Sequence, residues 1–249
     1  MPLNKLVYSQ TFKAAVSTVF FISILFSYNS SAQSFWFGVK GGGAMNLQNW
    51  GNGTTFSTNR DPLFSLNSDI FIESYDHDKK GSLYSSLGIH TRGSSLKFFN
   101  IGNVFQGNQS FKFHNVALEL GAKKSLKWDN EFNPYFSLGI RFEYTVGTNL
   151  DDYLSFGTFY YPHNDFVRKF NYGVSAGGGF EMLLSDLVGI FAEFSIHPDL
   201  SIQYEQPPLI GVTEPFTGNT VNIGLQQVRN VSIEFKIGIR LLRKVEYSD

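Results

Sequence analysis

The sequence predicts an all-β protein: an antiparallel up-and-down transmembrane β-barrel of eight strands, preceded by a cleaved N-terminal signal peptide. Three observations support this fold class. Apolar and polar residues alternate along eight segments, no apolar stretch after Phe26 approaches the length of a membrane-spanning helix, and the connections alternate between short and long. Residues 1–32 are assigned to the signal peptide and residues 33–249 to the barrel domain.

The first residues have the three-part pattern of a secretory signal. Lys5 and Lys13 are the only charged residues among them, an apolar run occupies residues 14–26, and small residues lead up to Ala32. The apolar run is shorter than the roughly 20 residues of a membrane-spanning helix. We therefore expect cleavage after Ala32, with a short N-terminal membrane anchor as the alternative.

The composition excludes several classes of protein. The chain has no Cys, which excludes lipid anchoring through a Cys, disulfides, thiolate metal sites and Cys nucleophiles. Charged residues make up only 16 % of the chain and form no basic run, so nucleic acid is not an expected partner. The glycine patterns of nucleotide-binding loops are absent. We expect no cofactor and no bound metal.

Two segments show the period of two most clearly. Along residues 135–146 and 231–241, apolar side chains alternate with Gly, Ser, Thr and charged ones. A helix would spread these apolar residues around its circumference, whereas a strand places them all on one face. The same alternation, with more interruptions, predicts six further strands at residues 35–46, 63–74, 82–97, 111–124, 167–184 and 188–197.

The connections predict how the strands are arranged. Short turns are expected at residues 76–81, 126–132 and 184–187, and long polar segments at residues 47–62, 98–110, 149–166 and 198–227. Short turns at one end and long loops at the other are typical of transmembrane barrels, and an even strand number puts both ends of the barrel domain on the periplasmic side. Within residues 198–227 we expect an extended hairpin projecting past the membrane. A barrel of ten strands is the alternative.

The polar faces of the predicted strands carry charges at mid-strand. An eight-stranded barrel is just wide enough for side chains to fill its interior, so acids and bases there should pair with one another. A soluble β-sandwich also alternates and is the alternative fold, but the charges at mid-strand and the large apolar faces favour the barrel. The predicted lumen network comprises Lys40, Asp69, Glu73, His90, Arg92, Glu119, Lys123, Arg141, Glu143, Glu181, Glu193, Glu234, Lys236 and Arg240.

Aromatic residues gather near the predicted strand ends, where transmembrane barrels carry belts at the two membrane interfaces. The predicted belt residues are Phe35, Trp36, Phe37, Trp128, Phe132, Tyr135, Tyr160 and Tyr161.

Three blocks carry a resemblance to a known family. Residues 37–47 read FGVKGGGAMNL, residues 135–140 read YFSLGI, and residues 172–181 read YGVSAGGGFE. With the Ala32–Gln33 junction, they resemble the PorT-like outer-membrane β-barrel family of Bacteroidetes, over most of residues 33–243. The resemblance implies an outer-membrane barrel and no particular activity. One branch of that family belongs to a protein secretion system, and nothing in this sequence selects that branch.

Three functional classes remain open. The leading one is a structural or interaction barrel that is not an enzyme and acts through its extracellular loops. The second is a narrow pore for small solutes. The third is a lipid-modifying enzyme, a hydrolase or deacylase, with a rim site of His197, Glu193 and Ser195. We expect an outer-membrane location after export through the periplasm, contacts with outer-membrane lipid and with proteins at the loops, and a monomeric state.

Overall fold

The computed structural model describes residues 34–52, 60–75, 81–99, 105–126, 133–156, 161–213 and 218–243. The barrel lies within the compact unit Phe35–Arg243. The predicted signal peptide and its cleavage position lie outside the described residues.

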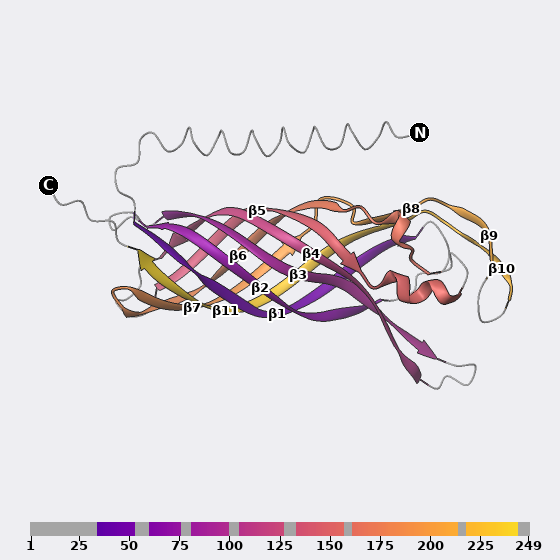
Figure 1. Ribbon diagram of the computed structural model, residues 1–249, viewed down its shortest axis with the longest axis horizontal. Coiled ribbons are helices and arrows are strands. Elements are labelled where there is room, and N and C mark those ends of the chain that lie inside the picture. Colours follow the sequence, from indigo (N-terminus) through magenta and orange to yellow (C-terminus); the bar gives the residue numbers. More distant parts are fainter. Residues whose placement is uncertain are drawn as a thin grey trace, which may run out of the picture. The chain divides into compact units, whose positions relative to one another are not determined.

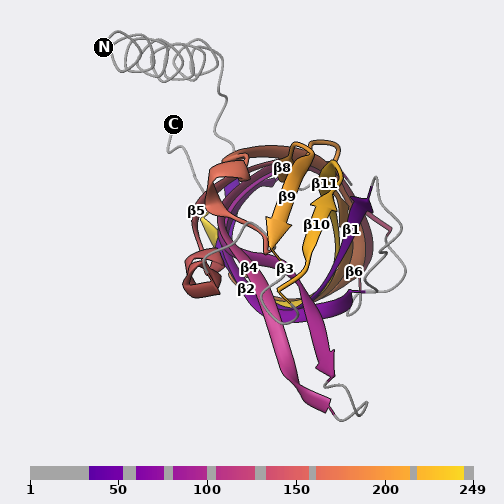
Figure 2. The same ribbon diagram turned by 90° about the vertical axis from the view of Figure 1, so that its right-hand side faces the viewer.

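Eight long antiparallel strands form a closed ring, as the sequence predicts (Figures 1 and 2). The ring strands are β1 (Ser34–Asn52), β2 (Asp61–Tyr75), β3 (Gly81–Phe99), β4 (Phe105–Ser125), β5 (Asn133–Thr148), β6 (Phe170–Ser185), β7 (Val188–Pro198) and β11 (Gln226–Arg243). Three short strands and two short 3₁₀ helices lie between them: β8 (Tyr204–Gln206), β9 (Leu209–Thr213), β10 (Thr220–Ile223), η2 (Leu150–Phe156) and η3 (Asn164–Phe166). No helix in this part of the chain is both long enough and apolar enough to cross a membrane.

The ring closes between its first and last strands. Neighbours in sequence pair from β1 to β7, β11 pairs with β7, and β11 then pairs with β1. The β1–β11 ladder runs without interruption from Phe35 opposite Arg243 to Asn52 opposite Gln226. A closed ladder leaves no strand edge unpaired along the barrel wall, which is what lipid requires of a β-structure. Because the ring is closed, the alternative fold, a soluble β-sandwich of two separate sheets, is excluded.

The alternation of the sequence separates the two faces of the wall. The outward face is apolar: Leu66 is 83 % exposed, Leu138 is 60 % exposed and Phe235 is 52 % exposed. The inward face contains the charged residues and many of the glycines. At Gly42 a Cβ atom would collide with the backbone of Phe235 on β11, so only glycine allows this close strand pairing.

Several predicted loops are partly strand. Residues 98–110 were expected to be a loop, but β3 continues to Phe99 and β4 begins at Phe105. This hairpin extends beyond the ring (Figure 2), where no continuous core imposes a strict alternation on the sequence. Within residues 198–227, β8 pairs with β11 while β9 and β10 form a two-stranded sheet. The expected continuation of the seventh and eighth ring strands into an extended hairpin is present in part, because β7 ends at Pro198 and pairing with β11 resumes only at β8. The ring has eight strands rather than ten.

The predicted aromatic belts are partly wrong. Trp36, Tyr135 and Tyr161 are each less than 5 % exposed, because they point into the barrel or its outer mouth rather than toward lipid. Phe37 is 43 % exposed and does face outward. Trp128, Phe132 and Tyr160 lie outside the described residues.

A charge-filled lumen as the candidate functional site

The strand alternation brings the predicted network residues together inside the barrel. All of them except Glu193 are buried, and the Glu193 side chain is only 12 % exposed. They come from all eight ring strands, so residues far apart in sequence become neighbours in the lumen.

Arg92 on β3 is the centre of the outer part of this network. Its Nη2 lies 2.6 Å from Glu143 Oε1 on β5, and its Nη1 lies 2.7 Å from Glu234 Oε1 on β11. Nη2 also donates to His90 Nδ1 at 2.8 Å, which leaves His90 Nε2 to donate to Asp69 at 2.7 Å. One guanidinium thus connects three strands across the lumen, and such charge-assisted bonds are strong where water is excluded.

Lys236 and Arg141 extend the network on either side of Arg92. Lys236 Nζ lies 2.7 Å from Asp69 and 2.6 Å from Glu234. Arg141 Nε lies 2.9 Å from Glu143 Oε1, and its Nη2 pairs with Asp199. Asp199 was not among the predicted lumen residues. The alternation of β7 could have found it, because position 199 continues the inward face of positions 193, 195 and 197.

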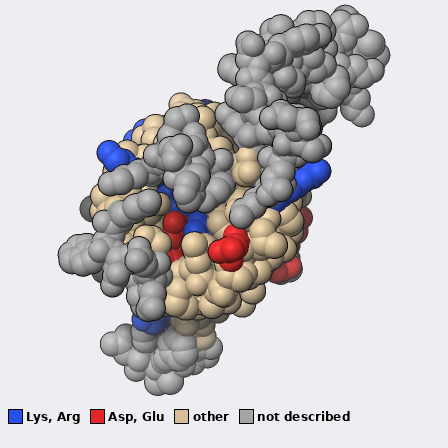
Figure 3. Space-filling model, turned by 90° about the vertical axis from the view of Figure 1, so that its left-hand side faces the viewer, with Lys and Arg blue, Asp and Glu red and all other residues tan. Residues whose placement is uncertain are grey.

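A second group of ion pairs lies nearer the end where β1 begins. Lys123 Nζ lies 2.6 Å from Glu181 and 3.1 Å from Glu73, and Arg240 Nη1 lies 2.7 Å from Glu181. The Arg240 guanidinium also stacks on Trp36, 4.3 Å from the ring centroid. Figure 3 views this end of the molecule, where acidic and basic side chains are visible among uncharged ones.

Glu119 and Glu193 lie between these two groups. Glu119 accepts hydrogen bonds from Tyr84 at 2.6 Å and from Ser175 at 2.7 Å. Lys40 donates to Glu193 at 2.8 Å. Two neutral hydroxyls therefore bind the Glu119 carboxylate directly, whereas Glu193 pairs with a lysine.

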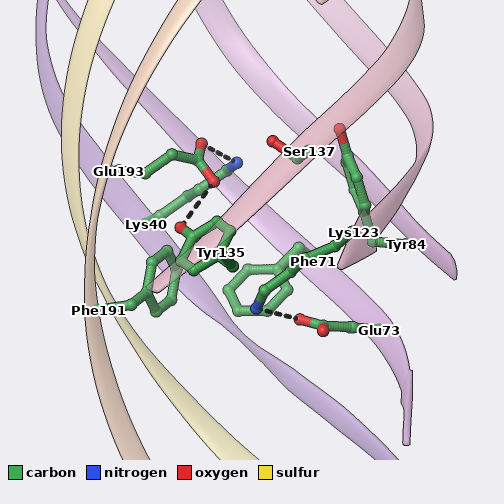
Figure 4. A pocket seen from close by; sticks show the side chains of 9 residues that line it. All are labelled: Lys40, Phe71, Glu73, Tyr84, Lys123, Tyr135, Ser137, Phe191 and Glu193. Atoms are coloured by element: carbon green, nitrogen blue, oxygen red, sulfur yellow. Dashed lines mark hydrogen bonds and ion pairs between the residues drawn. The ribbon is translucent and has the colours of Figure 1, made fainter. Parts of the chain in front are cut away.

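A small cavity lies within the described part of the lumen (Figure 4). Its volume is about 20 Å³, which is room for about one water molecule. Figure 4 shows the Lys40–Glu193 and Lys123–Glu73 pairs on either side of it, with Tyr135 donating to Glu193. The cavity is lined by Lys40, Phe71, Glu73, Tyr84, Lys123, Tyr135, Ser137, Phe191 and Glu193.

A cluster of apolar and aromatic side chains fills the opposite end of the barrel, which carries the long connections. We call this cluster the outer plug. Trp50 and Tyr204 lie with ring centroids 5.5 Å apart, and Phe111 lies 4.9 Å from Tyr153 on η2. The residues of the outer plug are Trp50, Phe111, Phe113, Leu150, Tyr161, Tyr204 and Val228, with Tyr153, Phe166 and Val167 packed against them.

The predicted rim site is only partly assembled. Ser195 Oγ lies 2.8 Å from His197 Nε2, whereas Glu193 pairs with Lys40 and Tyr135 instead. The carboxylate paired with His197 is that of Glu234, 3.6 Å from the same Nε2, and within the described part of the chain His197 Nδ1 has no hydrogen-bond partner. Among the described residues, no group of His, Asp and Glu is arranged to hold a metal ion.

No family model and no curated protein matches this chain. Among solved structures, the outer membrane protein OprG from Pseudomonas aeruginosa is similar, with a TM-score of 0.52 and 10 % identity over 84 % of this chain and 96 % of that one. Neisserial surface protein A aligns with a TM-score of 0.45 and 8 % identity over 83 % of this chain and 96 % of that one. This chain has the fold of outer-membrane β-barrel proteins. Its closed ring and apolar outer wall suit it to that membrane, as the sequence predicts.

Proposed function

We propose that this protein is a structural or interaction barrel of the outer membrane that conducts no solute and makes its contacts through its outer loops. The observation that carries the proposal is the double closure of the lumen. Paired charges fill the barrel interior, and the outer plug covers them, leaving a cavity of about 20 Å³. A hydrated ion would have to break several buried ion pairs to pass.

The end of the barrel that carries the long connections supports a role in binding protein partners. The β3–β4 hairpin and the β9–β10 hairpin both extend beyond the ring (Figures 1 and 2). Ile210 on β9 is 88 % exposed there, an apolar side chain available to a partner. We propose that the monomeric barrel holds these hairpins for protein partners while outer-membrane lipid surrounds the wall.

Conductance in a planar lipid bilayer tests this proposal against the narrow pore. The purified protein is expected to give no unitary currents in bilayers where a porin of known conductance, measured in parallel, does so. Heat modifiability of the same sample on a gel verifies that the barrel is folded. Reproducible unitary currents from folded protein would support the pore instead.

The lipid-modifying enzyme is disfavoured by the geometry around His197. In a Ser–His–acid triad the acid binds the imidazole nitrogen opposite the one facing serine. Here Ser195 and Glu234 both lie on the Nε2 side, and His197 is only 2 % exposed inside the lumen. Lipopolysaccharide from cells with the intact protein and with His197→Ala is expected to have identical masses. A mass difference would restore the enzyme hypothesis.

We also propose that the chain belongs to the PorT-like family, because residues 37–47, 135–140 and 172–181 resemble motifs of that family. The glycines of the resembling blocks do not distinguish this family from other barrels, since close strand pairing already requires glycine at positions such as Gly42. Cross-linking in cells tests the secretion branch: capture of other secretion components by the outer hairpins would favour that branch.

A further inference from the structure

Arg60 occupies an unusual position at the outer plug. It lies directly before β2, and its guanidinium carbon is 3.5 Å from the centroid of the Trp50 ring and 4.8 Å from that of Phe111. Trp50 and Phe111 belong to the outer plug and are at most 9 % exposed, so this cation stacks on the inner side of the barrel mouth.

Arg60 has no acidic partner within the described chain. Its Nε and Nη1 are buried and have no hydrogen-bond partner among the residues that the structure describes. Nearby acids are engaged elsewhere: Asp61 lies 3.1 Å from Lys97, and Glu205 pairs with Arg168. In the described outer connections, Asp151, Asp152 and Asp165 are exposed to solvent and form no ion pair with Arg60.

A partly buried cation without an acidic partner is costly, and the stacking only partly offsets that cost. A cation–π contact contributes about 0.5–2 kcal/mol, whereas removing an ion from water costs several kcal/mol. Burial lowers the pKa of Arg60 to about 9, so the guanidinium still carries its charge at neutral pH. Stacking uses the faces of the guanidinium and leaves its in-plane N–H donors free to bind an oxyanion.

We propose that Arg60 binds the carboxylate or phosphate of a small amphipathic molecule, whose apolar part lies over the partly buried side chains at the edge of the outer plug, Tyr153, Phe166 and Val167. The molecule would come from the external solution, because Arg60 stacks on rings that face the barrel interior and not the lipid. This ligand class goes beyond the proposed function, since a non-conducting barrel needs no such site.

Calorimetric titration of the full-length barrel in a neutral detergent tests the site with three probes: hexanoate, hexyl phosphate and uncharged hexanamide. Hexanoate and hexyl phosphate are expected to bind at least about tenfold more tightly than hexanamide, because only they offer an anionic acceptor to the guanidinium. This comparison uses the unaltered protein. Equal binding of hexanoate and hexanamide, or binding of none of the three, would overturn the proposal.

Two variants then locate the site. Arg60→Gln is expected to weaken hexanoate binding about tenfold, whereas Arg168→Gln, which removes an exposed arginine already paired with Glu205, is expected to leave it unchanged. Heat modifiability verifies that both variants are folded. Unchanged binding by folded Arg60→Gln would contradict the assignment.

A lipid source is tested by repeating the hexanoate titration in nanodiscs. Binding is expected to be equal in phosphatidylcholine and phosphatidylglycerol nanodiscs. Loss of binding only in phosphatidylglycerol would assign the site to a lipid headgroup and overturn the external source. Neither result depends on the conductance measurement, so failure of this proposal and failure of the non-conducting barrel remain distinguishable.

Discussion

The lumen around Arg92 and the outer plug close the same barrel by different means. Arg92 and its partners Glu143 and Glu234 all lie on ring strands, whose relative positions the ladders fix. The outer plug combines strand residues such as Phe111 with Leu150 on η2 and Tyr204 on β8, which lie in the connections. Removing one partner of a buried ion pair leaves the other charge buried and unpaired, which strongly destabilises the protein. In an apolar cluster, the loss of stability instead grows with the number of buried atoms removed.

The largest effect is expected from Arg92→Met. It leaves Glu143 and Glu234 without their shared cation in a buried site, which should lower the free energy of unfolding by about 4 kcal/mol. Urea unfolding in detergent micelles measures this change. Lys97→Met removes a cation from an exposed pair with Asp61 and should cost less than about 1 kcal/mol. If both variants lost a similar free energy of unfolding, the ion pairs of Arg92 would stabilise the barrel no more than an exposed ion pair does.

A smaller effect is expected from Leu150→Ala. Leu150 is fully buried in the outer plug, so truncation should lower the free energy of unfolding by roughly 3 kcal/mol. The variant should stay silent in the bilayer, because the ion pairs below still fill the lumen. Ile210→Ala, on the exposed hairpin, is the matched control and should change nothing. Currents through Leu150→Ala would mean that the outer plug alone closes the barrel.

The smallest effect is expected from Tyr204→Phe. The hydroxyl donates to Gln206 at 2.6 Å and accepts from the His163 amide at 3.2 Å. Its loss should cost about 1 kcal/mol and accelerate hydrogen exchange at the His163 amide. Tyr144→Phe, whose ring is half exposed on the outer wall, is the control. An unchanged His163 exchange rate would show that this bond does not hold the connection in place.

The strands could be predicted because alternation needs no knowledge of a partner. Residues 135–146 and 231–241 alternate strictly, and both lie in ring strands. The inward direction of the charged residues followed from the same pattern. The particular partners of Arg92 could not be predicted, because they depend on how far each strand is shifted against its neighbours across the whole ring.

The outer end was harder to predict for a different physical reason. Tyr161 looked like an interface aromatic, since a sequence pattern cannot distinguish a ring facing lipid from one packed into the outer plug. Arg60 gave no signal at all, because it lies between two alternating segments and its stacking on Trp50 and Phe111 joins three separate parts of the chain.

The β1–β11 ladder has a consequence for how the protein is made. Until these two strands meet, each presents a row of unpaired N–H and C=O groups, and lipid offers nothing to bond with them. Six other ring strands separate β1 from β11 in the sequence. Biogenesis must therefore shelter both edges while all eight strands are delivered. A chain cut before β11 would have a seam that it could close only by pairing with another molecule.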